Sequence, residues 1–163
     1  MEPLLAIVVI GIGATALMDV WTVMRKTLLG VAPANYAMVG RWLLHMTRGQ
    51  FRHQAIAAAP AMRGEHSVGW LAHYLIGIAF AALLIAIFGA SWLQQPSLLP
   101  ALAVGIATVA APFLLMQPAM GAGVAARRTP NPVSARLHSL LTHSIFGLGL
   151  YLSGQALMLL SAL

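Results

Sequence analysis

Four stretches of the chain are almost continuously apolar, and they lie at residues 3–24, 67–93, 98–123 and 137–163. Each has at least the roughly 20 residues that an α-helix needs to cross a hydrocarbon core about 30 Å thick. None shows the alternation of apolar and polar residues that marks the strands of a membrane barrel. The pattern predicts an all-α, polytopic membrane protein whose four transmembrane helices form a bundle, as a single membrane domain over residues 1–163.

The connection at residues 25–66 is too apolar and too aromatic for a flexible linker. Within it, residues 35–48 predict a short helix that lies in the membrane interface, because Asn35 is a good N-cap and apolar side chains follow at helical spacing. Arg41 and Arg48 fall on the polar side of this helix. We therefore expect an interfacial helix in a cytoplasmic loop.

The basic residues occupy only two segments of the chain. All nine Lys and Arg lie at residues 25–63 and 127–136, and the termini and the turn at 94–96 have none. Because positively charged loops stay in the cytoplasm, both termini and this turn are predicted on the other side. Short basic loops beside apolar spans favour membrane lipids over nucleic acid as partners.

The first apolar run has an alternative interpretation as a secretory signal peptide, helped by the small residues Ala14 and Ala16. A signal peptide begins with positive charge, whereas this run follows Glu2. We therefore interpret it as a span.

The amino-acid composition excludes several kinds of catalytic and metal-binding chemistry. Hydrophobic residues make up 60% of the chain and charged residues 7%, and there is no cysteine, which excludes disulfides, thiolate metal sites and thiol catalysis. No nucleophile elbow, phosphate-binding loop or dinucleotide fingerprint is present. The sequence thus gives no positive sign of an enzyme.

Two segments of the chain resemble each other. Residues 71–77 and 141–147 share the pattern His-x-x-x-Gly, and residues 13–15 are similar to 106–108. This indicates two helical hairpin repeats, although chance similarity among apolar helices is the simpler alternative.

One polar residue in each span falls at a similar depth. By their spacing from the nearest loop arginines or span ends, Asp19, His73, Gln117 and His143 lie roughly 9 to 10 Å below the cytoplasmic boundary, at ~1.5 Å of rise per residue. Because ionisable residues inside spans are costly, this layer predicts a binding site for a proton or a cation.

Other interpretations of these residues stay open. Asp19 can pair locally with Arg25 or Thr22, and each histidine can bond a neighbouring helix. His73 and His143 can instead ligate haem b, or, together with Asp19, a divalent metal ion. Gly77 and Gly147, one turn beyond the two histidines, fit either helix packing or room for a flat ligand.

The loops hold a second group of candidate residues. A phosphate or a lipid headgroup is the expected contact of Arg41, Arg48, Arg52, His53, Arg127 and Arg128. The alternative is that these charges only set the topology. His45, His53 and His66 are expected at the surface or in the interface. In the third span, Pro112 and Pro118 predict a kink, because each removes a backbone donor.

The sequence resembles a family of small bacterial four-helix inner-membrane proteins that is catalogued as a domain of unknown function. The resemblance covers nearly the whole chain and rests on Asn35-Tyr36, Gly40-Arg41-Trp42, Phe51-Arg52-His53, Gly69-Trp70, His73-Tyr74, Gln117-Pro118, Thr129-Pro130-Asn131-Pro132, and His143 with Gly147. It implies the four-span topology in a bacterial inner membrane and no particular activity.

Three functions remain in competition. The first is a transporter or channel-like protein that is a homo-oligomer, because four spans seldom enclose a pathway. The second is a haem- or metal-binding redox protein. The third is a structural or lipid-binding subunit of a larger complex, which docks through residues 41–63.

Overall fold

The computed structural model describes residues 2–161, and this part of the chain folds into helices and turns without strands. The four helical segments that are long and apolar enough to cross a membrane are Pro3–Leu29, Glu65–Phe88, Leu98–Met120 and Pro132–Ser161. The predicted fold class is confirmed. The first helix runs past the apolar residues and the fourth begins before them, because backbone hydrogen bonds continue into the more polar boundary region.

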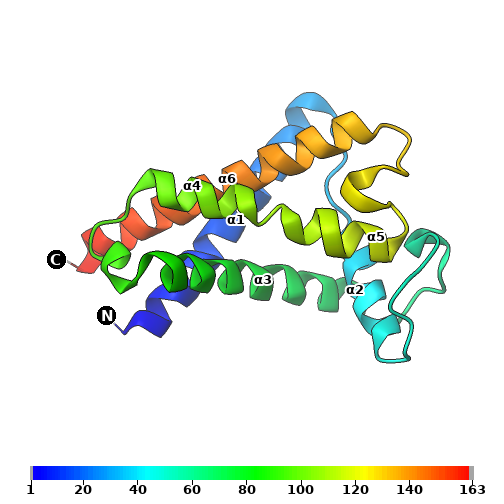
Figure 1. Ribbon diagram of the computed structural model, residues 1–163, viewed down its shortest axis with the longest axis horizontal. Helices are drawn as coiled ribbons and strands as arrows, with labels where there is room; N and C mark the ends of the chain where they lie inside the picture. The colour runs from blue at the N-terminus through cyan, green and yellow to red at the C-terminus, as the bar shows by residue number, and fades with distance from the viewer. Residues whose placement is uncertain (1, 162–163) are drawn as a thin grey trace. The chain divides into compact units, whose positions relative to one another are not determined.

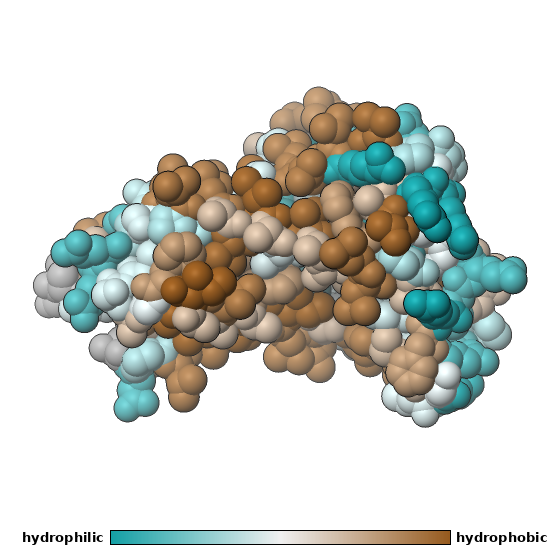
Figure 2. All heavy atoms as spheres, viewed as in Figure 1, coloured by the Kyte–Doolittle hydropathy of each residue, from teal (hydrophilic) through white to brown (hydrophobic). Residues whose placement is uncertain are grey.

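Large apolar side chains cover the outside of these helices. Leu28 is 73% exposed, Leu99 78% and Leu160 68%. Figure 2 shows the hydrophobic residues in brown over the surface of the helices. Soluble proteins rarely expose apolar surface on this scale, so these helices identify a membrane protein.

The contacts between residues divide the chain into two compact units. Unit 1 contains residues 1–33, 74–108 and 141–163, and unit 2 contains residues 34–73 and 109–140. Two long helices contribute to both units, so the prediction of a single domain stays a prediction. The two units are described separately below.

Unit 1 contains α1 (Pro3–Leu29), the C-terminal part of α3 (Glu65–Phe88), the short η2 (Ala90–Leu93), α4 (Leu98–Ala107) and most of α6 (Pro132–Ser161). Figure 1 traces these helices by colour along the chain. Their shared core is almost completely buried and includes Ile10, Ala14, Leu84, Ala101 and Leu150. This core contains small residues as well as large ones, and the small ones let the helices approach closely.

Glycines allow close contacts between the helices of unit 1. A Cβ at Gly77 of α3 would collide with Thr15 of α1, and one at Gly105 of α4 would collide with Gly147 of α6. The first span thus packs on the second and the third on the fourth through glycines near the histidines of the predicted repeat. The hairpin repeat stays a prediction.

The turn at residues 94–96 and the end of α6 lie together at one end of unit 1. The Gln155 side-chain amide donates a hydrogen bond to the Pro96 carbonyl at 2.8 Å, and Trp92 packs against Gly154. Ile7, near the start of α1, packs on the same cluster. Within this unit the beginning of α1, the turn and the end of α6 therefore share one end. The side of the membrane on which that end lies stays a prediction.

Unit 2 contains α2 (Tyr36–Met46), η1 (Ile56–Ala58), the start of α3, the π-helix η3 (Ala111–Met116), α5 (Gln117–Met120), η4 (Val124–Ala126) and the start of α6. The Asn35 side chain accepts a hydrogen bond from the Ala37 amide at 3.1 Å, so the predicted N-cap is confirmed. Gly40 and Gly69 let α2 and α3 meet backbone to backbone.

The third span is interrupted where the prolines predict it. The regular helix α4 ends at Ala107, and a π-helix then covers Ala111–Met116. Pro112 has no amide proton, so it cannot donate to the carbonyl one turn earlier, and the wider helical turn follows. The predicted irregularity is confirmed.

The Gly77 contact gives a stability prediction. Gly77→Val places side-chain atoms against Thr15 and should lower the free energy of unfolding by about 1–3 kcal/mol, the usual cost of overpacking. Denaturation in mixed detergent micelles measures it. Ala79→Val on the exposed face of α3 is the matched control, with an expected change near zero. Equal effects of the two substitutions would contradict the packing described.

Candidate functional site

Asp19 has a hydrogen-bond partner from the next span. The Tyr74 hydroxyl of α3 donates to Asp19 Oδ2 of α1 at 3.0 Å. Asp19 lies one turn after Thr15, and Tyr74 lies nearly one turn before Gly77, so the glycine contact brings the two side chains together. Thr22 donates its hydroxyl to the Met18 carbonyl at 2.9 Å. Sequence reasoning missed Tyr74 and chose its neighbour His73.

His143 is oriented by a threonine at the interruption of the third span. The Thr108 hydroxyl donates to the Gly105 carbonyl at 2.6 Å and lies 2.9 Å from His143 Nδ1. A hydroxyl has one proton, so Thr108 accepts from Nδ1, and His143 carries its proton on Nδ1. His143 Nε2 is then left with a lone pair that can accept a proton or bind a metal ion.

His73 and Gln117 belong to unit 2, whereas Asp19 and His143 belong to unit 1. The His73 ring stacks on Tyr36 at 4.0 Å between ring centroids, and Trp70 meets both rings edge-on. The Gln117 side-chain oxygen is buried and has no hydrogen-bond partner. The four-residue site stays a prediction.

The metal interpretation gains no support from the arrangement of the ligands. Among residues 2–161, no three His, Cys, Asp or Glu side chains lie together as candidate metal ligands. The interpretation of Asp19, His73 and His143 as ligands stays a prediction, as does haem b.

Arg41 is the central cation of unit 2. Its guanidinium forms a two-bond ion pair with Glu65, with Nε to Oε2 at 2.8 Å and Nη2 to Oε1 at 2.7 Å. Nη1 also reaches the carbonyls of Ile56, Ala57 and Ala59. The hydrogen bonds that Arg41 donates to the Glu65 carboxylate raise the pKa of Arg41 above its ordinary value. The Arg41 side chain thus links α2 to the loop at residues 56–59 and to the start of α3.

This arrangement corrects the sequence interpretation of Arg41. We expected Arg41 on the polar side of an interfacial helix, in contact with headgroups, but it is only 9% exposed and its donors are engaged within the protein. Helical spacing alone does not show that a carboxylate 24 residues later reaches the same face. The sequence signal that could have predicted the Arg41–Glu65 pair is the small number of acidic residues. The chain has only three, so an arginine has few possible ion-pair partners.

His45 is a second correction. We expected it at the surface, but it is 3% exposed, with Nε2 3.0 Å from the Pro60 carbonyl and Nδ1 2.8 Å from the Gln50 side-chain oxygen. A carbonyl only accepts, so Nε2 carries a proton and donates to Pro60. The ring of His53 meets that of His45 at 5.0 Å, and His53 Nε2 is buried without a partner. His53 is half-buried rather than a surface group.

The remaining loop cations are exposed. Arg48, Arg52, Arg127 and Arg128 all lie at the surface, as headgroup contacts require. Their contact with an anion stays a prediction. Arg25, by contrast, is buried, and its Nη1 lies 3.5 Å from the Thr142 hydroxyl.

The comparison with protein families agrees with the resemblance drawn from the sequence motifs. A family described as "Protein of unknown function (DUF2938)" matches residues 8–157. The chain belongs to the DUF2938 family. No curated protein and no solved structure matches it. Membership of the DUF2938 family therefore assigns no activity to this protein.

The Asp19–Tyr74 hydrogen bond gives a spectroscopic prediction. Tyr74→Phe removes the donor and should shift the carboxyl bands of Asp19 in the infrared spectrum, with a loss of about 0.6 kcal/mol in stability, typical of membrane hydrogen bonds. Comparison with the spectrum of Asp19→Asn identifies the bands that belong to the Asp19 carboxyl group. Tyr151→Phe, in the same unit, should leave them unchanged. A Tyr74→Phe spectrum identical to that of the wild type would contradict the bond.

The Arg41 ion pair gives a prediction about the loop. Arg41→Met leaves Glu65 without its ion-pair partner, with only the hydrogen bond from the Met62 amide, and frees three carbonyls, so the amides of residues 53–65 should exchange with deuterium faster. Arg48→Met, on the exposed part of the same loop, is the control and should exchange like the wild type. The double variant Arg41→Met with Glu65→Met should protect the start of α3 better than Arg41→Met alone, because no unpaired carboxylate remains.

Proposed function

We propose that the protein is a small transporter or channel-like protein in which Asp19 binds a proton or a cation as it crosses the membrane. The observation that carries this proposal is the hydrogen bond between Tyr74 and Asp19 inside the helical spans. A carboxylate within a span is costly and is usually retained where it serves an ion or proton pathway. The Tyr74 hydroxyl donates to Asp19 Oδ2 and so holds the carboxylate in a fixed position between α1 and α3.

His143 supports proton transfer in the same unit. Its Nδ1 proton is directed to Thr108, so Nε2 is the acceptor for an arriving proton. The imidazole then becomes a donor at both nitrogens and can release the proton from Nε2 again. Asp19 and His143 are thus two groups of unit 1 whose protonation can change during a transport cycle.

The interrupted third span supports the same class of function. In transporters, substrates and ions bind where a spanning helix is broken and its polar groups become accessible. Here the break follows α4, and the buried Gln117 oxygen lies just beyond the π-helix without a partner. An unpaired amide oxygen is a suitable ligand for a cation or a protonated substrate.

The assembly and the orientation are also part of the proposal. Four spans enclose little space between them, and many large apolar side chains stay on the outside, so we infer a homo-oligomer. The distribution of Lys and Arg favours an inner membrane with both termini on the non-cytoplasmic side.

A liposome flux assay tests the proposal. Purified protein is reconstituted into liposomes that contain a pH-sensitive dye, and a K⁺ gradient with valinomycin drives protons inward. The wild type should acidify the interior faster than empty liposomes do, and Asp19→Asn should fall to the rate of empty liposomes. Glu2→Gln is the matched control, because Glu2 is an exposed acid outside the span, and it should keep the wild-type rate.

The same assay with a Na⁺ dye covers the cation alternative. A wild type that moves neither protons nor Na⁺ faster than empty liposomes do would contradict the proposal. So would an Asp19→Asn variant as active as the wild type.

A further inference from the structure

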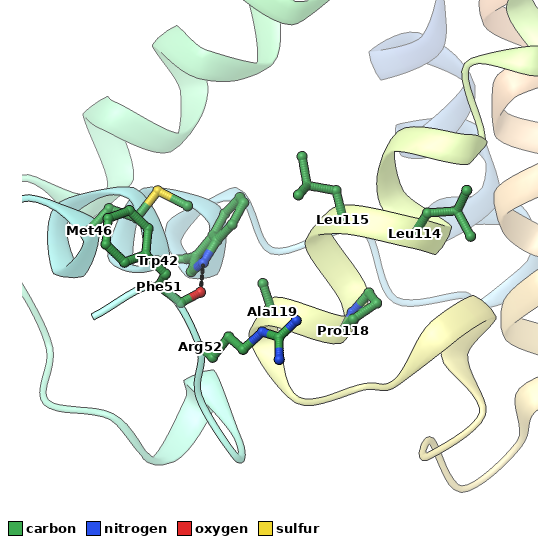
Figure 3. A pocket seen from close by; sticks show the side chains of 8 residues that line it. All are labelled: Trp42, Met46, Phe51, Arg52, Leu114, Leu115, Pro118 and Ala119. Carbon is green, nitrogen blue, oxygen red and sulfur yellow. Dashed lines mark hydrogen bonds between the residues drawn. The ribbon is translucent and has the colours of Figure 1, made fainter. Parts of the chain in front are cut away.

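Unit 2 contains a pocket that the proposed transport function does not use. It measures about 180 Å³ and is lined by Trp42, Met46, Phe51, Arg52, Leu114, Leu115, Pro118 and Ala119. Figure 3 shows that Trp42 and Met46 come from α2, Phe51 and Arg52 from the following loop, and the other side chains from the π-helix and α5. The Trp42 indole donates to the Phe51 carbonyl at 3.0 Å, which fixes the loop against α2.

The lining combines an apolar wall with a single cation. Leu114 and Leu115 are 65% and 62% exposed, so they continue the apolar wall outward to the surface of the span. Arg52 is exposed and makes no hydrogen bond or ion pair with residues 2–161. The sequence segments of unit 2 contain one acidic residue, Glu65, and that residue is bound to Arg41. The charge of Arg52 is therefore not neutralised from within unit 2.

The position of the pocket indicates which class of molecule would bind in it. One wall belongs to the spanning segment Leu98–Met120, and the other belongs to the basic loop at residues 25–66. A boundary between a span and a basic loop is where lipid phosphates meet acyl chains. The volume is below the roughly 300–1,000 Å³ of common small-molecule sites and suits part of an acyl chain.

We propose that this pocket binds an anionic phospholipid, with part of one acyl chain between Trp42 and Leu115 and the phosphate on Arg52. The guanidinium suits phosphate because its planar donors can contact two oxygens at once. The apolar wall distinguishes a lipid from free phosphate, which would leave that wall uncovered. This site lies entirely in unit 2 and does not depend on the proposed transport function.

Native mass spectrometry of the full chain in mild detergent tests the site. The protein is titrated with phosphatidylglycerol and with phosphatidylcholine of the same acyl chains. The wild type should prefer phosphatidylglycerol, and Arg52→Gln should bind it about fivefold more weakly, the effect of one basic residue at a membrane surface. Arg48→Gln, the exposed arginine outside the pocket, should keep the wild-type preference.

Two further arms test the acyl chain and the source of the phosphate. Leu115→Ser is an exposed substitution that should weaken the binding of both lipids, because it removes apolar wall. Excess inorganic phosphate should not displace phosphatidylglycerol. Equal phosphatidylglycerol binding by Arg52→Gln and Arg48→Gln would overturn the proposal. Displacement by phosphate, or a protein dimer lost in Leu115→Ser while lipid binding is unchanged, would overturn it as well.

Discussion

Close contact between helices at glycine positions is the constraint on which the rest of this structure depends. In a membrane, helices gain little from burying apolar surface, so they associate through close packing and a few polar contacts. Among the glycine contacts that leave no room for a side chain, three are those of Gly77 with Thr15, Gly105 with Gly147, and Gly40 with the backbone at Glu65. Two of them lie in unit 1 and one in unit 2.

Each of these contacts has a polar pair within about one helical turn. Tyr74 bonds Asp19 beside the first, Thr108 bonds His143 beside the second, and Arg41 bonds Glu65 beside the third. A polar side chain is short compared with the usual distance between helix axes, so it reaches a partner only where the backbones come near. The glycines therefore determine both the packing and the chemistry of the two units.

The two proposals use different results of this packing. In unit 1, the pairs lie inside the candidate spans and hold the side chains of Asp19 and His143, on which the proposed transport function depends. In unit 2, Arg41 engages the one carboxylate, and its hydrogen bonds to loop carbonyls hold the loop that carries Arg52. The second proposal thus depends on the ion pair, because a loosened loop would no longer place Arg52 beside the apolar pocket.

The sequence by itself determined the number of spans, the cap at Asn35 and the break near Pro112. These features depend on the length of an apolar run or on the chemistry of one residue, which act locally along the chain. Only the tertiary structure decided that Tyr74 serves Asp19 across 55 residues, and that Arg41 turns inward to Glu65. Such pairs depend on which helix faces meet, and in uniformly apolar helices the spacing of residues does not mark that face.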